Sequence, residues 1–442
     1  MSDRPIGIDL FAGAGGMSLG FEQAGFDIVA AVEVDPIHAA THLYNFPETA
    51  VLARSIVGLT GDDIRSAARL GRRTVDVVFG GPPCQGFSLI GQRVLDDPRN
   101  LLVREFVRVV AELRPKTFVF ENVKGLTVGS HRHFLKALIE AFGDAGYTVR
   151  QPWRVLNAMH YGVPQDRERL FLLGAREGLP VPMYPDPTTS PEPDLFSSGG
   201  RALTPTCADA LSDLPDAEEF AELLRSDSVE ITGWKTGTAY ARACRCETEE
   251  AWHFGYRRVW DRNLLTSSMR TVHTQISRRR FRDTKPGRVE PISRFFKLDP
   301  KGLCNTLRAG TDSARGAFTS PRPIHFAYDR CITVREMARL HGYPDWFRFH
   351  VTKWHGARQV GNSVPPPLAK AIASGVIAAL GIRPRRPSKC VELAHPGLLC
   401  MDMGEAAQYW KIPVPISRRD RKNGLRKRKQ TEIEEAIRTQ GL

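Results

Sequence analysis

Residues 75–88 read VDVVFGGPPCQGFS, and this stretch organises the chain. The apolar run at 75–79 predicts a buried strand, which Pro82 and Pro83 must end because proline cannot donate to a sheet ladder. Cys84 is therefore expected on a stiff loop at a strand end, where open α/β sheets bind their ligands. Such a loop favours a nucleophilic thiolate; the alternative is a buried structural cysteine. A helix is predicted from Asn100 onward.

The N-terminal residues predict a strand, a glycine-rich turn and a helix. Residues 6–11 form an apolar strand pattern, 13–16 read GAGG, and 17–24 have a helical pattern. A glycine turn at this point lets a cofactor approach the backbone. A second strand at 28–32 ends at Glu33, about 20 residues after the turn, where the hydroxyls of a ribose need an acceptor. The pattern favours a nucleoside cofactor over a dinucleotide; the alternative is a scaffold without a cofactor.

Two further strand boundaries carry charged residues. The apolar run at 117–120 is followed by Glu121, whose partial burial would raise its pKa toward proton sharing. The alternative is an ordinary surface turn. Arg167 and Arg169 precede a strand at 170–173, and their spacing predicts that both guanidinium groups lie on one side. For these arginines, the alternative is an exposed ion-pair network with the neighbouring acids.

Length and composition limit the classes of protein that fit. The 442 residues, 42% of them hydrophobic, allow two or three domains with real cores. No apolar run is long enough to span a membrane, and the first residues lack a signal-peptide pattern, so we expect a cytoplasmic protein with reduced thiols. Cys244 and Cys246, with His253 nearby, fit no strong zinc pattern, and no metal site is predicted.

The charge and the later part of the chain indicate a polyanionic partner. The net charge is +13, which favours nucleic acid over the simple need for solubility. Residues 185–325 lack a strand–helix rhythm and mix aromatic residues with many arginines, including a cluster at 278–282. Helical periodicity returns at Thr333, a predicted N-cap with Glu336 three residues later.

Taken in order, these motifs resemble those of bacterial-type cytosine-C5 DNA methyltransferases over about residues 5–380. The resemblance implies an α/β fold: a Rossmann-like S-adenosylmethionine-dependent methyltransferase sheet with a second, smaller target-recognition domain. It also implies a division of the chain into four parts: a first catalytic and cofactor-binding part at 1–184, a target-recognition domain at 185–325, a closing catalytic part at 326–381 and a basic extension at 382–442.

The resemblance assigns roles residue by residue. The implied catalytic residues are Cys84, Glu121, Arg167 and Arg169. The implied contacts to S-adenosylmethionine are Phe11, Gly13, Gly15, Gly16, Glu33, Ser55, Ile56, Pro82, Leu102, Asn362 and Ser363. One position departs from the family pattern, because Ser55-Ile56 stands where an acid usually contacts the adenine amino group. Asp62 and Asp63 are the alternative acids.

The resemblance implies that the protein methylates C5 of a cytosine flipped out of a specific duplex DNA sequence. Cys84 would add to C6, Glu121 would hydrogen-bond N3 and the amino group, and Arg169 would hold O2. Arg167 would support the loop or bind a phosphate. The loop at 85–99 would close over the flipped base. We expect a monomer on DNA, the modification enzyme of a restriction-modification or similar system, with any cognate endonuclease acting separately.

Two rival functions share these motifs. One is a tRNA cytosine-5 methyltransferase, which the large insert at 185–325 disfavours because RNA-acting members tend to have a smaller one. The other is a catalytically silent DNA-binding module, which the intact catalytic residues disfavour. The run at 418–429 has eight Lys or Arg in twelve positions and predicts either a flexible phosphate-binding arm or a solvated charge run.

Overall fold

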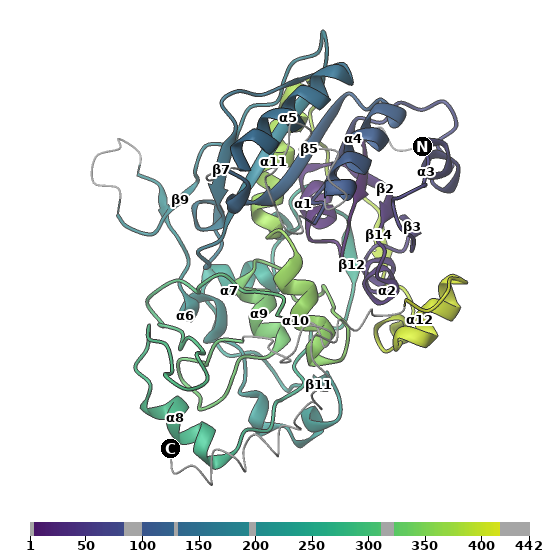
Figure 1. Cartoon of the computed structure of the whole chain (residues 1–442). Helices are drawn as coiled ribbons and strands as arrows, with labels where there is room; N and C mark the ends of the chain where they lie inside the picture. The colour runs from purple at the N-terminus through teal and green to yellow at the C-terminus, as the bar shows by residue number, and fades with distance from the viewer. Residues whose placement is uncertain (1–3, 84–99, 128–130, 194–199, 311–321, 416–442) are drawn as a thin grey trace, which may run out of the picture.

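The computed structural model describes residues 4–83, 100–127, 131–193, 200–310 and 322–415. Cys84, the loop at 85–99 and the basic run at 418–429 lie outside the described residues. Figure 1 shows two lobes, an upper one built on a large sheet and a lower one with helices and long irregular segments. The strands of the upper sheet are β1 (Ile6–Leu10), β2 (Asp27–Val32), β3 (Ala50–Leu52), β4 (Val77–Gly80), β5 (Thr117–Val123), β6 (Tyr147–Val149), β7 (Arg154–Asn157) and β8 (Glu168–Arg176).

Within the described residues these strands form one sheet of order β3-β2-β1-β4-β5-β8-β6, with β7 also pairing with β8. The pairs from β3 to β5 are parallel, and β8 joins β5 in the antiparallel direction. In the parallel part, Leu10 pairs with Gly80, and Gly80 with Phe120. The carboxyl ends of β1, β4 and β5 therefore meet at one edge, where doubly wound sheets bind their ligands.

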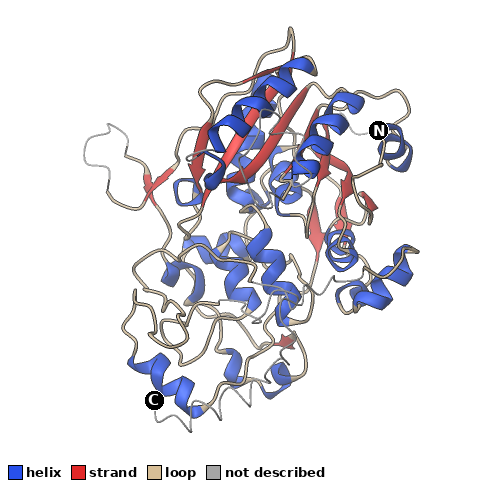
Figure 2. Ribbon diagram, in the orientation of Figure 1, coloured by secondary structure: helices blue, strands red, loops and turns tan. Residues whose placement is uncertain are grey.

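Helices cover both faces of this sheet (Figure 2). Apolar side chains of α4 and α5 pack on one face, together with Ile64 of α3. On the other face, α1 packs against α11. The helices of this lobe are α1 (Gly16–Ala24), α2 (Pro36–Asn45), α3 (Gly61–Ala67), α4 (Leu101–Leu113), α5 (His131–Asp144) and α11 (Pro366–Ala379). The α/β fold class predicted from the sequence is thus confirmed.

Local sequence signals placed most of these elements correctly. The predicted strand at 75–79 is β4, and the predicted helix at 17–24 is α1, which begins after Gly15 in a left-handed conformation (φ 103°). The N-cap predicted at Thr333 is confirmed: its hydroxyl accepts from Glu336 N, and the Glu336 carboxylate accepts from Thr333 N. The structure adds a helix that the sequence did not predict, α10 (Lys353–Asn362), whose last two residues are Gly361 and Asn362.

The lower lobe has an apolar core drawn mainly from residues 207–307 and from the segment around α9 (Val334–Leu340), and Leu19 and Phe46 of the upper lobe also pack into it. Its other elements are β9 (Thr189–Ser190), β10 (Ala202–Leu203), α6 (Cys207–Leu211), β11 (Val229–Glu230), α7 (Ala239–Cys244), β12 (Arg257–Val259), β13 (Leu264–Leu265) and α8 (Gln275–Asp283). Because α9 contributes to this core, the boundary predicted near residue 326 crosses continuous packing.

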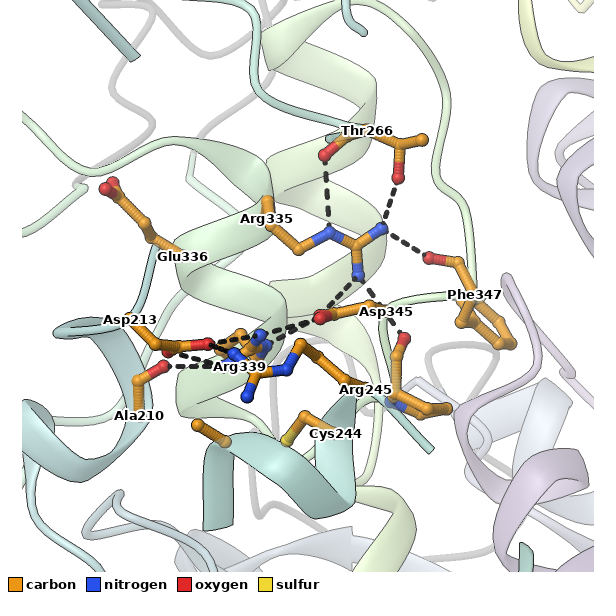
Figure 3. A network of polar contacts seen from close by, with 12 residues as sticks. Ala210, Asp213, Cys244, Arg245, Thr266, Arg335, Glu336, Arg339, Asp345 and Phe347 are labelled. Atoms are coloured by element: carbon orange, nitrogen blue, oxygen red, sulfur yellow. Dashed lines mark hydrogen bonds and ion pairs between the residues drawn. The ribbon is translucent and has the colours of Figure 1, made fainter. Parts of the chain in front are cut away.

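Buried arginines of α9 link separate segments of this core to one another (Figure 3). The Arg339 side chain lies between Asp345, at 2.6 Å from Nε to Oδ1, and Asp213, at 3.1 Å from Nη1 to Oδ1. One turn away, Arg335 donates to the Thr266 hydroxyl and to the Phe347 carbonyl. Such charges are tolerated in a core because each guanidinium N–H finds an acceptor. The network ties α9 to segments more than a hundred residues earlier in the chain.

Candidate active site

The sheet edge brings together residues that are distant in sequence. Phe11 follows β1, Gly81 and Pro82 follow β4, and Glu121 lies near the end of β5. The Asn122 side chain donates to the Pro82 carbonyl at 3.0 Å, which fixes the turn two residues before Cys84. The structure therefore places the beginning of the Cys84 loop beside Glu121, although Cys84 itself lies outside the described residues.

The position of the Glu121 carboxylate depends on an ion pair with Arg169 and on the space left by Gly81. Its Oε1 lies 2.9 Å from Arg169 Nε, and both side chains are nearly buried. Burial raises the pKa of Glu121, although Arg169 and Arg167 act in the opposite direction. A Cβ at Gly81 would lie 2.3 Å from Glu121 Oε2, so only glycine leaves room for the carboxylate in this position. This carboxyl group is thus poised to share a proton rather than to remain a fully solvated anion.

Arg167 has a different environment from Arg169. Its side chain is completely buried and donates to three main-chain carbonyls: Leu307 at 2.7 Å, Gly361 at 2.8 Å and Ser363 at 2.9 Å. These contacts favour the loop-supporting role over phosphate binding, because a buried guanidinium cannot reach solvent-exposed DNA. Arg167 thus joins Leu307, in the lower lobe, to the closing motif, residues 361–364 at and just after the end of α10.

The alternative of an exposed ion-pair network around these arginines is not what the structure contains. The neighbouring acids have other partners: Asp166 accepts from the Asn157 side chain at 2.6 Å, and Glu168 pairs with Lys124 at 2.8 Å. Arg169 therefore keeps its Nε for Glu121.

The glycine turn after β1 is closed by Glu33. One carboxylate oxygen of Glu33 accepts from Gly13 N and the other from Asp35 N, both at 2.8 Å. Phe11 and Gly13 both have positive φ (64° and 55°), which creates a tight turn with main-chain groups exposed toward the edge. A Cβ at Gly16 would lie 2.7 Å from the Val364 carbonyl, so the closing motif packs directly on this turn.

A buried polar chain beneath this turn escaped the sequence analysis. Ser18 donates to Asp9 Oδ2 at 2.6 Å, and its hydroxyl lies 3.0 Å from His42 Nε2. All three side chains are buried. Burial raises the pKa of Asp9 to about 8 and lowers that of His42 to about 3, so both groups favour their neutral forms. Asp9 lies within β1, and a single acid in an otherwise apolar strand was the sequence signal that could have indicated this buried chain.

The remaining predicted cofactor residues surround the same edge. Ser55 is exposed after β3, and its hydroxyl accepts from Val57 N at 3.1 Å. Ile56 is buried and Leu102 half-buried, both against the core of the α4 face.

The alternative acid Asp63 already has a partner, because its carboxylate accepts from Thr60 N in the capping box at the start of α3. The other predicted contacts, Asn362 and Ser363, lie at the end of α10, where Ser363 is half-buried and Asn362 exposed.

The arginine cluster at 278–282, on α8, is less available to bind the phosphates of a nucleic acid than its sequence suggests. Three of its arginines already have carboxylate partners: Arg278 pairs with Glu218, Arg280 with Glu290 and Arg282 with Asp329. Arg279 and Arg282 are the exposed arginines of the cluster, and Arg282 is already paired with Asp329.

Neither a metal site nor a membrane span is found in the part of the chain that the structure describes. Cys244 and Cys246 are buried, and burial raises the pKa of both thiols. No group of three His, Cys, Asp or Glu in the described ranges is arranged to hold a metal ion. None of the helices in those ranges is long and apolar enough to cross a membrane.

Comparison with known proteins agrees with this geometry. The family model of C-5 cytosine-specific DNA methylases matches residues 7–378. Type II methyltransferase M.XorII of Xanthomonas oryzae pv. oryzae is 57% identical over 419 residues, covering 95% of each chain. Type II methyltransferase M1.HphI of Haemophilus parahaemolyticus is 35% identical over 375 residues, covering 84% of this chain and 86% of its own.

A solved structure is similar over nearly the same range. It is a prophage-encoded E. coli protein assigned as a DNA modification methyltransferase, with a TM-score of 0.68 and 32% identity. The match covers 85% of this chain and 99% of that protein. The family match spans both lobes, including the strand ends that carry Glu33, the Cys84 loop, Glu121 and Arg169. The chain therefore belongs to the family of C-5 cytosine-specific DNA methylases.

Proposed function

We propose that this DNA (cytosine-5-)-methyltransferase modifies a specific duplex DNA sequence as a Type II enzyme, and that it acts on a flipped cytosine through a covalent bond to Cys84. The family assignment and the Type II relatives support the general activity. The single observation that carries the detailed mechanism is the Glu121–Arg169 pair, at 2.9 Å, beside the turn that leads into Cys84.

The proposed chemistry overcomes the low reactivity of the cytosine ring. Its C5 is a poor nucleophile, and addition of the Cys84 thiolate to C6 turns C5 into an enamine carbon. Negative charge then develops on the ring at N3 and O2. Glu121, with its raised pKa, shares a proton at N3 and contacts the amino group, while the guanidinium of Arg169 orients Glu121 and reaches O2. After methylation a base removes the C5 proton, the C5–C6 double bond re-forms, and Cys84 leaves.

The residues around the glycine turn fit S-adenosylmethionine. This cofactor supplies an electrophilic methyl group when it is bound. Glu33 lies at the end of β2, where a ribose needs an acceptor, and it already orders the turn through Gly13. Phe11, Gly15, Gly16, Pro82, Ile56, Leu102, Asn362 and Ser363 complete the proposed cofactor contacts.

The adenine end of the cofactor is proposed to lie near Ser55. Asp63 caps α3 through Thr60, which disfavours it as the adenine acceptor. Ser55 is exposed just beyond β3, the neighbour of β2, and its hydroxyl remains able to donate. These contacts support Ser55 as the residue that takes the place of the acid in other family members, with Asp62 as the remaining alternative.

Duplex DNA is proposed to lie against the sheet edge and the lower lobe. A stacked cytosine cannot reach a carboxyl group that is nearly buried, so the target base must leave the helix. The segment at 85–99 is proposed to close over that base. The net charge of +13 supports binding to a polyanion, although the paired arginines of α8 supply less free charge than the sequence suggests.

We further propose that the protein acts as a monomer on DNA, as the modification half of a restriction-modification system whose endonuclease is a separate chain. The Type II naming of the relatives supports the role in a restriction-modification system.

The decisive experiment is expression in a host that lacks DNA methylation, followed by base-resolution mapping of 5-methylcytosine. We expect one short sequence motif to be methylated throughout the host DNA. Purified enzyme should transfer methyl groups to duplex DNA and not to tRNA assayed alongside. Transfer to tRNA alone would establish the RNA-acting alternative, and duplex binding without any transfer would establish the silent module.

A further inference from the structure

Beyond the region matched by the family, the chain continues as an ordered segment packed on the cofactor side of the molecule. This segment comprises β14 (Cys390–Glu392) and α12 (Met403–Trp410) with a short helical turn between them. The family model ends at residue 378, whereas the match to M.XorII covers 95% of this chain and so continues past that point. The segment from 390 to 410 is therefore a structured addition, in contrast to the flexible extension predicted for the far tail.

The segment contacts both lobes. In the lower lobe, β14 pairs in parallel with β12, and β12 is tied to α1 because Arg258 forms a buried pair with Glu22 at 2.8 Å. In the upper lobe, Leu398 and Leu399 form a small apolar core with Ala40 and Tyr44 of α2. Figure 1 shows α12 lying beside α2.

The decisive contact lies at the first turn of α2. The indole Nε1 of Trp410 donates to the Pro36 carbonyl at 3.1 Å. Pro36 directly follows Asp35, whose carboxylate caps α2 by accepting from Ile37 N and His38 N. The main-chain N–H of Asp35 in turn donates to Glu33 Oε1 at 2.8 Å. One chain of contacts thus runs from the added segment to the carboxylate that closes the glycine turn.

We propose that Trp410 is a positioning residue for the cofactor site: through Pro36 and the Asp35 cap, the added segment holds Glu33 in the orientation that binds S-adenosylmethionine. This inference rests on the proposed role of Glu33. The position of α12 is itself fixed, because Ala406 and Ala407 are buried and a capping box between Asp402 and Glu405 stabilises the start of the helix. Loss of the indole N–H should loosen the turn without removing any group that contacts DNA.

The test compares Trp410→Phe with Tyr409→Phe. The first keeps an aromatic ring but removes the donor to Pro36, and the second changes an exposed neighbour on the same helix. For Trp410→Phe we expect S-adenosylmethionine to bind about two- to tenfold more weakly by calorimetry, as the loss of one hydrogen bond implies, with kcat at saturating cofactor unchanged. In the cofactor-free protein, hydrogen exchange at the main-chain amides of Asp35, Ile37 and His38 should accelerate. Tyr409→Phe should match the wild type in every measurement.

Two further variants make the outcome decisive. Asp402→Ala removes the cap of α12 while leaving Trp410 in place, and it should weaken cofactor binding in the same direction. Glu33→Gln tests the underlying assignment: unchanged cofactor affinity in that variant would refute the proposed cofactor site itself. If Glu33→Gln weakens binding but Trp410→Phe changes neither affinity nor amide exchange, the positioning role of Trp410 is wrong.

Discussion

Gly81→Ala should displace the carboxylate of Glu121, the proposed catalytic group, without unfolding the protein. A Cβ at this position would lie 2.3 Å from Glu121 Oε2 and 3.5 Å from Glu121 Cδ, while ordinary contacts begin at 3.4 Å. The carboxylate must therefore move by about 1 Å, away from its place beside Arg169, and a displacement of that size can lower a rate about 10²-fold. Because the displaced atom is the end of a side chain, the free energy of unfolding should change by less than about 1 kcal/mol.

The assay is transfer of labelled methyl groups to a duplex that contains the target, with cofactor affinity measured separately by calorimetry. The matched control is Gly143→Ala in α5, where an added Cβ meets nothing within 4 Å and helix propensity favours alanine. The control should keep full activity. A Gly81→Ala enzyme that is folded and retains kcat within threefold of wild type would refute the proposed placement of Glu121. Loss of cofactor affinity instead would mean that the new methyl group blocks the cofactor.

Three further outcomes are expected. Arg167→Met should lower the free energy of unfolding by at least about 2 kcal/mol in urea titrations, because the buried carbonyls of Leu307 and Gly361 lose this donor; a loss below about 1 kcal/mol would contradict the supporting role. Asp9 has a pKa raised to about 8 in the folded state, so its protonated form stabilises the fold at low pH, and this contribution is lost as the pH rises from about 4 to 8. Asp9→Asn should therefore gain stability relative to wild type over that range, by at most about 1.4 kcal/mol per pH unit, and a constant difference would argue against the shift. Deleting 417–442 should weaken binding to all duplexes alike and reduce the log–log salt slope by about 0.9 per lost phosphate contact, with the methylated sequence unchanged; an unchanged slope would mean that the basic run is only solvated.

Sequence alone predicted those features that depend on neighbours along the chain. The strand before the two prolines, the glycine turn with Glu33 and the capping box at Thr333 each depend on a few consecutive residues. The family resemblance implied that Glu121 and the Cys84 loop share one site, and in the structure the parallel pairing of β4 with β5 brings Glu121 and the start of that loop to one sheet edge.

Contacts between distant segments were beyond sequence reasoning. Arg167 reaches carbonyls 140 and 194 residues away, at Leu307 and Gly361, and no local pattern indicates this. The helix α10 contains Gly356 and Gly361, which disfavour a helix by propensity. A Cβ at Gly361 would lie 2.5 Å from Ala309 N, so close packing against the end of the lower lobe requires this glycine. Tertiary packing thus overrides the local preference.

The central claim is that Cys84 forms a bond to C6 of the target cytosine, and trapping tests it most directly. Duplex DNA with 5-fluorocytosine at the target should be methylated once and then held, because the fluorine at C5 cannot leave as a proton does. We expect wild-type enzyme, in the presence of S-adenosylmethionine, to form a complex with this DNA that survives denaturing electrophoresis. Cys84→Ala should still bind the duplex but form no such complex. A denaturation-resistant complex with the alanine variant would contradict the assignment of Cys84 as the nucleophile.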